Sequence, residues 1–260
     1  MIFSLLSIQK FILIIYNYIK LQGEDDKMRI FQKGFNYSQD GPGNRLVYHL
    51  SGCNMRCIWC SNPEGMDGKG GREYSIEEIA KECVNSRMMF FSGGGVTFTG
   101  GEATVQLDEL MEILKILKEK GIHTAIETNG TSERLQEILG YIDYLIMDFK
   151  HYDGEVLKKY TGMGNKTIKY NFEENCRKGR QQHIRIPLIN KINTEKPEKF
   201  AEYFSRHNTE NTVFEFLPYH EYGKGKWKEE YKVEDGFVSE EAVNDFVRIF
   251  KEHGLRVINT

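Results

Sequence analysis

Apolar residues recur in two alternating patterns from about residue 45 to the end of the chain. Short runs of β-branched and aromatic residues predict strands at 46–50, 96–99, 124–127, 144–149, 184–189 and 213–217. Apolar positions three and four residues apart predict helices between them, at 107–120, 132–139, 197–206 and 240–253, before a last strand-like stretch at 255–258. Ser75 and Glu78 form a capping box, which predicts the start of one more helix.

This alternation predicts an α/β fold in which helices cover a parallel sheet. The chain holds about six strand–helix repeats, with no long Pro- or Ser-rich linker between them. Six repeats are fewer than the roughly eight that close a (β/α)8 barrel. We therefore expect an open, partial (β/α)6 barrel of the TIM type, formed by one domain over residues 28–260.

Polar side chains follow the predicted strands at the points where the strands end. Because the carboxyl ends of parallel strands lie at one edge of a sheet, we expect these side chains to line one rim, where chemistry collects in α/β folds. The set comprises Cys53, Gly100, Gly101, Glu102, Glu127, Thr128, Asn129, Asp148, Lys150, Arg185, Tyr219 and His220.

The overall composition argues against a general nucleic-acid-binding protein and against a disulfide-rich one. The 260 residues carry a net charge of -3, whereas general nucleic-acid binding shows as a basic domain. Five cysteines in a chain of this length do not make a disulfide framework, so we expect a reducing compartment, the cytoplasm.

The first 27 residues are apolar but interrupted. Their longest unbroken apolar run, Phe11 to Tyr16, is far shorter than the roughly 20 residues that cross a membrane. We interpret residues 1–27 as an extension, most simply explained by a start codon placed upstream of Met28. A weakly amphipathic interfacial segment is the second interpretation. A secretory signal is the third, although no small-residue cleavage site lies near Gly23.

Cys53, Cys57 and Cys60 carry the most specific chemistry, in Cys-x-x-x-Cys-x-x-Cys spacing. A structural zinc site or an electron-transfer cluster normally takes about four protein ligands. A cluster of four irons held by three thiolates leaves one iron free to bind a substrate. The alternative is a zinc site completed by His49 or Cys83, but zinc motifs usually come as two separated Cys/His pairs.

The other motifs each have a structural interpretation beside the functional one. Gly100-Gly101 could serve only a tight turn, and Asp148 with Lys150 could form a simple surface ion pair. Arg185 could form a structural salt bridge, and His220 gains weight only from its place after the last strand. We expect the remaining features to be structural: Cys83 and Cys176 as small buried residues, and Lys224, Lys226 and Lys228 in a solvated loop.

The ordered set of motifs resembles a known family. The cysteine triplet with Gly100-Gly101-Glu102 resembles the radical S-adenosylmethionine (SAM) superfamily. The segments at 40–43, 93–102, 127–130, 148–150, 160–162 and 217–220 resemble those of the activating enzymes of glycyl radical enzymes. The resemblance covers about residue 28 to the end of the chain.

The resemblance implies a partial (β/α)6 barrel that holds one 4Fe-4S cluster and SAM. By position, Cys53, Cys57 and Cys60 would hold the cluster, and Gly100, Gly101 and Glu102 would meet the methionine end of SAM. Asp148, Lys150 and His220 would contact its ribose and carboxylate, Arg185 would line the same pocket, and Glu127 and Thr128 are further candidates. The implied reaction is reductive cleavage of SAM, followed by removal of a hydrogen atom from a glycine of a partner glycyl radical enzyme.

Two departures from the family qualify this expectation. A cysteine-rich insert after the triplet is missing, so we expect one cluster and a compact build like that of pyruvate formate-lyase-activating enzymes. Glu127 stands where those enzymes carry a shorter acid, which bears on any bound monovalent cation.

The resemblance also implies partners. We expect a monomer that activates a formate acetyltransferase-like glycyl radical enzyme and takes its electron from a flavodoxin- or ferredoxin-type donor. Nucleic acid and membrane are not expected as partners. The alternatives are a radical SAM enzyme that acts on a small metabolite and a non-catalytic zinc or redox domain.

Overall fold

The computed structural model describes residues 26–91 and 93–259, so the expectation for residues 1–25 lies outside the described part. Its eight strands are β1 (Lys27–Tyr37), β2 (Asn44–Leu50), β3 (Arg72–Ser75), β4 (Gly95–Gly100), β5 (Thr124–Thr128), β6 (Tyr144–Asp148), β7 (Gln182–Leu188) and β8 (Thr212–Pro218). The α-helices are α2 (Ile76–Asn85), α3 (Leu107–Glu119), α4 (Leu135–Ile138), α5 (Gly154–Thr161), α6 (Lys166–Arg177), α7 (Pro197–Phe204) and α8 (Glu240–Glu252). Short 3-10 turns are η1 (Pro63–Gly65), η2 (Arg87–Met89), η3 (Ala103–Gln106) and η4 (Lys224–Lys226).

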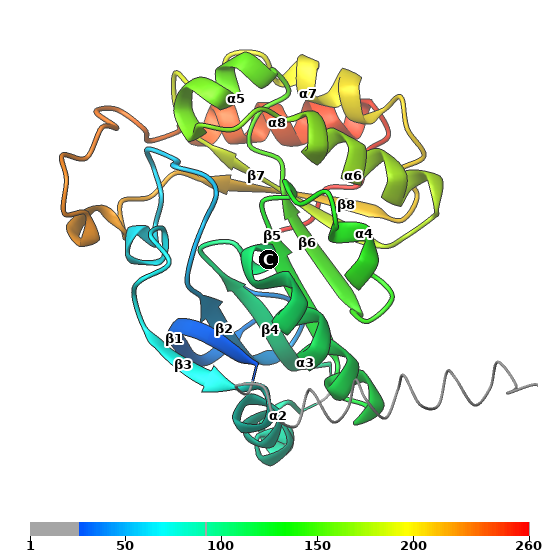
Figure 1. The fold of residues 1–260 in the computed structure, drawn as a ribbon. Coiled ribbons are helices and arrows are strands. Elements are labelled where there is room, and N and C mark those ends of the chain that lie inside the picture. The colour runs from blue at the N-terminus through cyan, green and yellow to red at the C-terminus, as the bar shows by residue number, and fades with distance from the viewer. Residues whose placement is uncertain (1–25, 92, 260) are drawn as a thin grey trace, which may run out of the picture.

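The strands form one sheet in the order β3-β1-β2-β4-β5-β6-β7-β8. Strands β2, β4, β5, β6, β7 and β8 are parallel, so the expected six-stranded parallel core of a partial barrel is confirmed. Figure 1 shows α2 and α3 on the outer side of the β1–β4 end, and α5 to α8 over β6 to β8. None of the helices in the described residues is long and apolar enough to cross a membrane.

Strands β1 and β3 were not expected. β1 is antiparallel to both β2 and β3, and it extends the parallel sheet at the side of the cysteine segment. Met28 and Ile30 of β1 are buried, on alternate positions of the strand, whereas Lys27 before them and Arg29 between them are more exposed. This short period-two pattern is a strand signal in the sequence, but it lies outside the strand–helix repeats.

Two expected elements differ from the structure. The helix at 132–139 is only the single turn α4, because the amide of Asn171 donates to the carbonyls of Gly130 and Ser132 and holds the preceding chain as a loop. The stretch at 255–258 contributes one isolated bridge, Val257 to Phe214, and no strand. The capping box of Ser75 and Glu78 is confirmed at the start of α2.

Aromatic packing between β6–β8 and their helices rigidifies the site's supporting wall. The fully buried rings of this cluster include Phe149, Phe172, Phe200, Phe204, Phe214, Phe246 and Phe250. Burial of one such ring contributes about 1.5–3 kcal/mol, so the cluster holds the carboxyl ends of these strands firmly in place.

Candidate functional site

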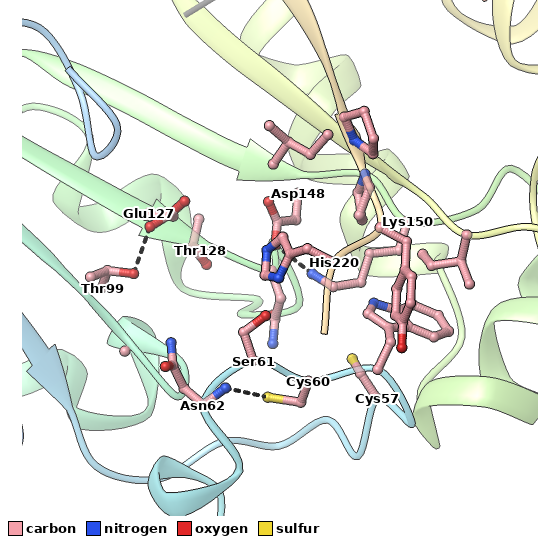
Figure 2. A pocket seen from close by; sticks show the side chains of 18 residues that line it. Cys57, Cys60, Ser61, Asn62, Thr99, Glu127, Thr128, Asp148, Lys150 and His220 are labelled. Carbon is pink, nitrogen blue, oxygen red and sulfur yellow. Dashed lines mark hydrogen bonds and ion pairs between the residues drawn. The ribbon is translucent and has the colours of Figure 1, made fainter. Parts of the chain in front are cut away.

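A cavity of about 260 Å³ opens at the carboxyl ends of the parallel strands. Figure 2 shows its side chains converging from the cysteine segment and from the strand ends. The lining residues are Cys57, Trp59, Cys60, Ser61, Asn62, Thr99, Gly100, Glu127, Thr128, Asn129, Asp148, Lys150, Pro187, Ile189, Leu217, Pro218, Tyr219 and His220. The expected single rim is therefore confirmed for most of the polar residues that end the strands.

The cysteine segment is held in place by backbone hydrogen bonds. Gly52 adopts a positive φ of 103°, which glycine permits, and its N–H donates to the carbonyl of Gly65 at 2.7 Å. On the other side, the N–H groups of Arg56 and Ile58 donate to the carbonyls of Thr161 and Tyr160, at 2.7 and 3.2 Å. The end of α5 thus fixes the loop between the cysteines, which gives the 160–162 motif a structural role.

The three thiols are free and largely withdrawn from solvent. Burial raises the pKa of the Cys57 thiol to about 12, and that of Cys60 to about 11, although the nearby Lys150 ammonium opposes both shifts. Burial also raises the pKa of Cys53. Backbone N–H groups already point at two sulfurs, from Met55 to Cys53 and from Asn62 to Cys60, both at 3.4 Å. A bound metal centre would deprotonate these thiols and be stabilised by the same donors.

The donor set fits a cluster better than a single ion. Within the described residues, no group of three or more His, Cys, Asp and Glu side chains is arranged to hold one metal ion. The thiolates of a four-iron cluster bind different irons, so they need not converge on one point. Neither proposed fourth zinc ligand joins them: Cys83 lies on α2 with its sulfur 3.7 Å from the Tyr48 hydroxyl, and His49 packs against Phe31.

Asp148 and Lys150 form a buried charged pair on the cavity wall. The Lys150 ammonium lies 2.6 Å from Asp148, and the lysine is only 8% exposed, so the expected alternative of a surface ion pair is wrong. Burial lowers the pKa of Lys150, but the Asp148 carboxylate and the Cys57 thiol outweigh burial, and the net pKa lies above the usual value. Lys150 therefore remains a cation facing the cavity, beside Cys57 and Cys60.

Arg185 does not line the cavity, contrary to expectation. Its side chain pairs with Glu127, with Glu215 at 2.9 Å and with the carbonyl of Gln39. The pairing with two carboxylates holds the Arg185 side chain behind Glu127. Glu127 itself lines the cavity, and its carboxylate accepts from the Thr99 hydroxyl at 2.7 Å. Burial raises the pKa of Glu127 while Arg185 lowers it.

Glu102 is buried beneath the cavity wall. Its carboxylate caps η3 and accepts from Thr104, from the Thr128 hydroxyl at 2.6 Å and from the N–H of Asn129 at 2.6 Å. Gly100 lines the cavity at a positive φ of 122°, and Gly101 lies against the carbonyl of Gly65. The glycines thus serve close backbone approach, and Glu102 fixes Thr128 and Asn129 at the cavity wall.

His220, Trp59 and Asn129 complete the cavity, and the family resemblance implied no ligand role for the last two. His220 follows β8, and its ring stacks on Tyr222 with centroids 4.3 Å apart; burial lowers its pKa. Trp59 lies between the second and third cysteines and, like Pro187 and Leu217, lines the cavity. Its aromatic ring at that sequence position was the signal that could have found it. Asn129, noted only as a strand-end residue, donates to Asn54 at 2.9 Å and lies near the Cys53 sulfur.

Comparisons with known proteins agree with this geometry. The model of the radical SAM superfamily matches residues 47–204. The pyruvate formate-lyase-activating enzyme of Clostridium pasteurianum is 36% identical over 208 residues, which is 75% of this chain and 85% of that protein. The pyruvate formate-lyase 1-activating enzyme of Escherichia coli strain K12 is 34% identical over 206 residues, 75% of this chain and 83% of that protein.

Solved structures give the same fold. A domain of the pyruvate-formate lyase-activating enzyme from Bacteroides vulgatus superposes with a TM-score of 0.55 at 28% identity, over 64% of this chain and 98% of that chain. Streptococcus suis SuiB bound to S-adenosylmethionine gives a TM-score of 0.65 over 82% of this chain and 49% of that chain. At 15% identity, the second likeness is one of fold alone.

Proposed function

Because the chain belongs to the radical SAM superfamily and to its family of activating enzymes, we propose that it activates a glycyl radical enzyme. One observation carries the proposal: the free thiols of Cys57 and Cys60, two of the three in the cysteine triplet, line the same cavity as the Asp148–Lys150 pair and Trp59. A cluster held by Cys53, Cys57 and Cys60 would supply an electron that cleaves SAM to methionine and a 5'-deoxyadenosyl radical. That radical would take a hydrogen atom from a glycine Cα of the partner enzyme, forming 5'-deoxyadenosine.

The cavity's own residues would bind and orient SAM. Among the polar lining residues, Thr128, Asp148 and Lys150 would meet the charged amino-acid part and the ribose, because an ammonium attracts a carboxylate and a carboxylate accepts from hydroxyls. Among the apolar lining residues, Trp59, Pro187, Ile189 and Leu217 would meet the adenine, which stacks well on an aromatic ring. His220 would close the ribose side.

The strand-end glycines and Glu102 would contribute at the methionine end. Gly100 brings bare backbone to the cavity. Glu102 already accepts from Thr128 and Asn129, so it would act on SAM by fixing these two residues or by exchanging one of its hydrogen bonds for the SAM amino group. Arg185 would act through Glu127.

A monovalent cation is a separate part of the proposal. Glu127 is the carboxylate that the family resemblance offers for it, and both oxygens of that carboxylate already have partners, Arg185 and Thr99. Occupation by a cation would therefore require Glu127 to release Arg185. The expected consequence is that SAM cleavage depends little on whether Na⁺ or K⁺ is supplied.

The partner, the electron donor and the compartment follow from the same proposal. The partner would be a formate acetyltransferase-like glycyl radical enzyme, and the donor a flavodoxin- or ferredoxin-type protein acting on a monomer in the cytoplasm. Five unpaired thiols within the described residues favour a reducing environment.

An isotope experiment tests the proposal against the small-metabolite alternative. The partner is prepared with deuterium at the α-carbon of its glycines, and mixed anaerobically with the reduced protein and SAM. Activation predicts one deuterium in the 5'-deoxyadenosine, measured by mass spectrometry. Unlabelled 5'-deoxyadenosine that accumulates equally with and without the partner would contradict it.

The domain assignment gives a second test. A chain that starts at Asp26 behind a new methionine is expected to keep its cluster and its rate of SAM cleavage. The physical reason is that this shorter chain keeps the contacts that anchor β1: the Asp26 carbonyl accepts from the N–H of Ile76 at 3.2 Å, and Met28 is fully buried. Far-ultraviolet circular dichroism and the 5'-deoxyadenosine assay measure the result, and loss of the fold would overturn the assignment.

A further inference from the structure

The loop after β8 reaches back to the cysteine segment across the molecule. We call residues 219–231 the clamp. Its first residues, Tyr219 and His220, line the cavity, and so do Ser61 and Asn62 of the chain that follows Cys60. The clamp therefore connects the proposed SAM cavity with the chain that follows Cys60.

One side chain of the clamp bonds a cluster cysteine directly. The indole N–H of Trp227 donates to the backbone carbonyl of Cys60 at 3.0 Å, over a sequence separation of 167 residues. Trp227 is half-buried, and its ring packs edge-on against Tyr231, whose hydroxyl lies 2.8 Å from that of Tyr219. The indole is thus held in place from behind.

Two further contacts fasten the same short stretch. Gly223 lies so close to Ser61 that an added Cβ would stand 2.6 Å from the Ser61 carbonyl oxygen, inside van der Waals contact. The Lys226 ammonium lies 2.9 Å from Glu64 and 3.2 Å from the side-chain oxygen of Asn62. The clamp therefore contacts four residues of this stretch, namely Cys60, Ser61, Asn62 and Glu64.

We propose that the clamp fixes the Cys60 side of the cluster loop and shields it from water and oxygen, with Trp227 as the positioning residue. This inference rests on the proposed function insofar as the three cysteines hold a cluster. Trp227 touches neither sulfur nor SAM; it acts by holding the Cys60 carbonyl. Loss of this donor would leave a partly buried carbonyl unpaired and let the loop move away from the cluster.

The first test replaces Trp227 by phenylalanine, which keeps a ring and removes the N–H donor. The cluster is loaded anaerobically, and its loss in a fixed concentration of oxygen is followed by iron–sulfide absorbance without SAM or partner. Trp227→Phe is expected to lose the cluster about fivefold faster than the unchanged protein, the factor that corresponds to one average hydrogen bond. Tyr170→Phe, an exposed ring on α6, is the matched control and is expected to change nothing.

The second test separates positioning from general stability. Gly223→Ala should push the clamp from Ser61 and speed cluster loss in the same direction, without removing any donor. If both variants act through one contact, the double variant loses the cluster no faster than the worse single variant. The melting temperature of the metal-free protein is expected to stay the same in all of them, because a mostly exposed loop can move off the cysteine segment without unfolding the sheet.

The outcomes distinguish the two proposals. If the unchanged protein takes up no iron and sulfide, the proposed function fails. If it holds the cluster and Trp227→Phe loses it at the same rate, the clamp is wrong and the proposed function stands. A rate that rises only in proportion to a lowered melting temperature of the metal-free protein would also overturn the positioning role.

Discussion

Cys57→Ala is expected to abolish both cluster binding and SAM cleavage. Cys57 is the most deeply buried of the three thiols, and its side chain lines the cavity beside Lys150. Two remaining thiolates cannot anchor a four-iron cluster that already leaves one iron without a protein ligand. Iron and acid-labile sulfide per chain should fall to background, and 5'-deoxyadenosine formation with a chemical reductant should become undetectable.

Cys83→Ala is the matched control for this prediction. Cys83 is equally buried, but it packs on α2 with its sulfur near the Tyr48 hydroxyl and away from the cavity. Its removal costs a small cavity in the core and leaves the three thiols untouched. It should retain iron, sulfide and SAM cleavage. A Cys57→Ala protein with a SAM-reactive cluster would refute the ligand assignment.

Lys150→Met is expected to leave the cluster in place and to weaken the binding and cleavage of SAM. The substitution keeps the length of the side chain and removes the Lys150 ammonium, which lines the cavity 2.6 Å from Asp148. A hydrogen bond to a charged group contributes about 1.5–3 kcal/mol, so kcat/KM for SAM should fall by about ten- to 150-fold. Iron and sulfide content should be unchanged, which separates SAM binding from cluster binding.

A surface pair of the same chemistry supplies the control. Lys191 lies 2.7 Å from Asp235, but these side chains are 71% and 52% exposed. Exposed pairs contribute about 0–1 kcal/mol, so Lys191→Met should leave kcat/KM for SAM unchanged. Equal kinetics in the Lys150→Met and unchanged proteins would remove Lys150 from the proposed SAM site.

The sequence predicted the parallel strands well because their signals are local. Each of the six is a short β-branched or aromatic run, and the polar residues that end them are brought to one cavity by the parallel topology. The pairing of Asp148 with Lys150 also follows from their spacing. The spacing of these residues does not reveal how deeply they are buried. In the structure, the burial of Lys150 fixes its ammonium as a cation that faces the cavity.

Contacts between distant segments were beyond the sequence pattern. Arg185 was expected in the pocket, but the alternation of its strand cannot reveal that Glu127 and Glu215, on two other strands, engage it first. Trp227 lies in a lysine-rich stretch that indicated a solvated loop. Its lysines are indeed exposed, whereas the indole bonds Cys60, because loop conformation depends on the surface on which the loop folds.

Electron paramagnetic resonance of the reconstituted system tests the central claim most directly. The reduced, cluster-loaded protein is mixed anaerobically with SAM and with a glycyl radical enzyme from the same organism, and the spectrum is recorded after freezing. The account predicts a glycyl radical on the partner, accompanied by 5'-deoxyadenosine and absent with the Cys57→Ala protein. Formation of 5'-deoxyadenosine with no radical on any glycyl radical enzyme of that organism would contradict it.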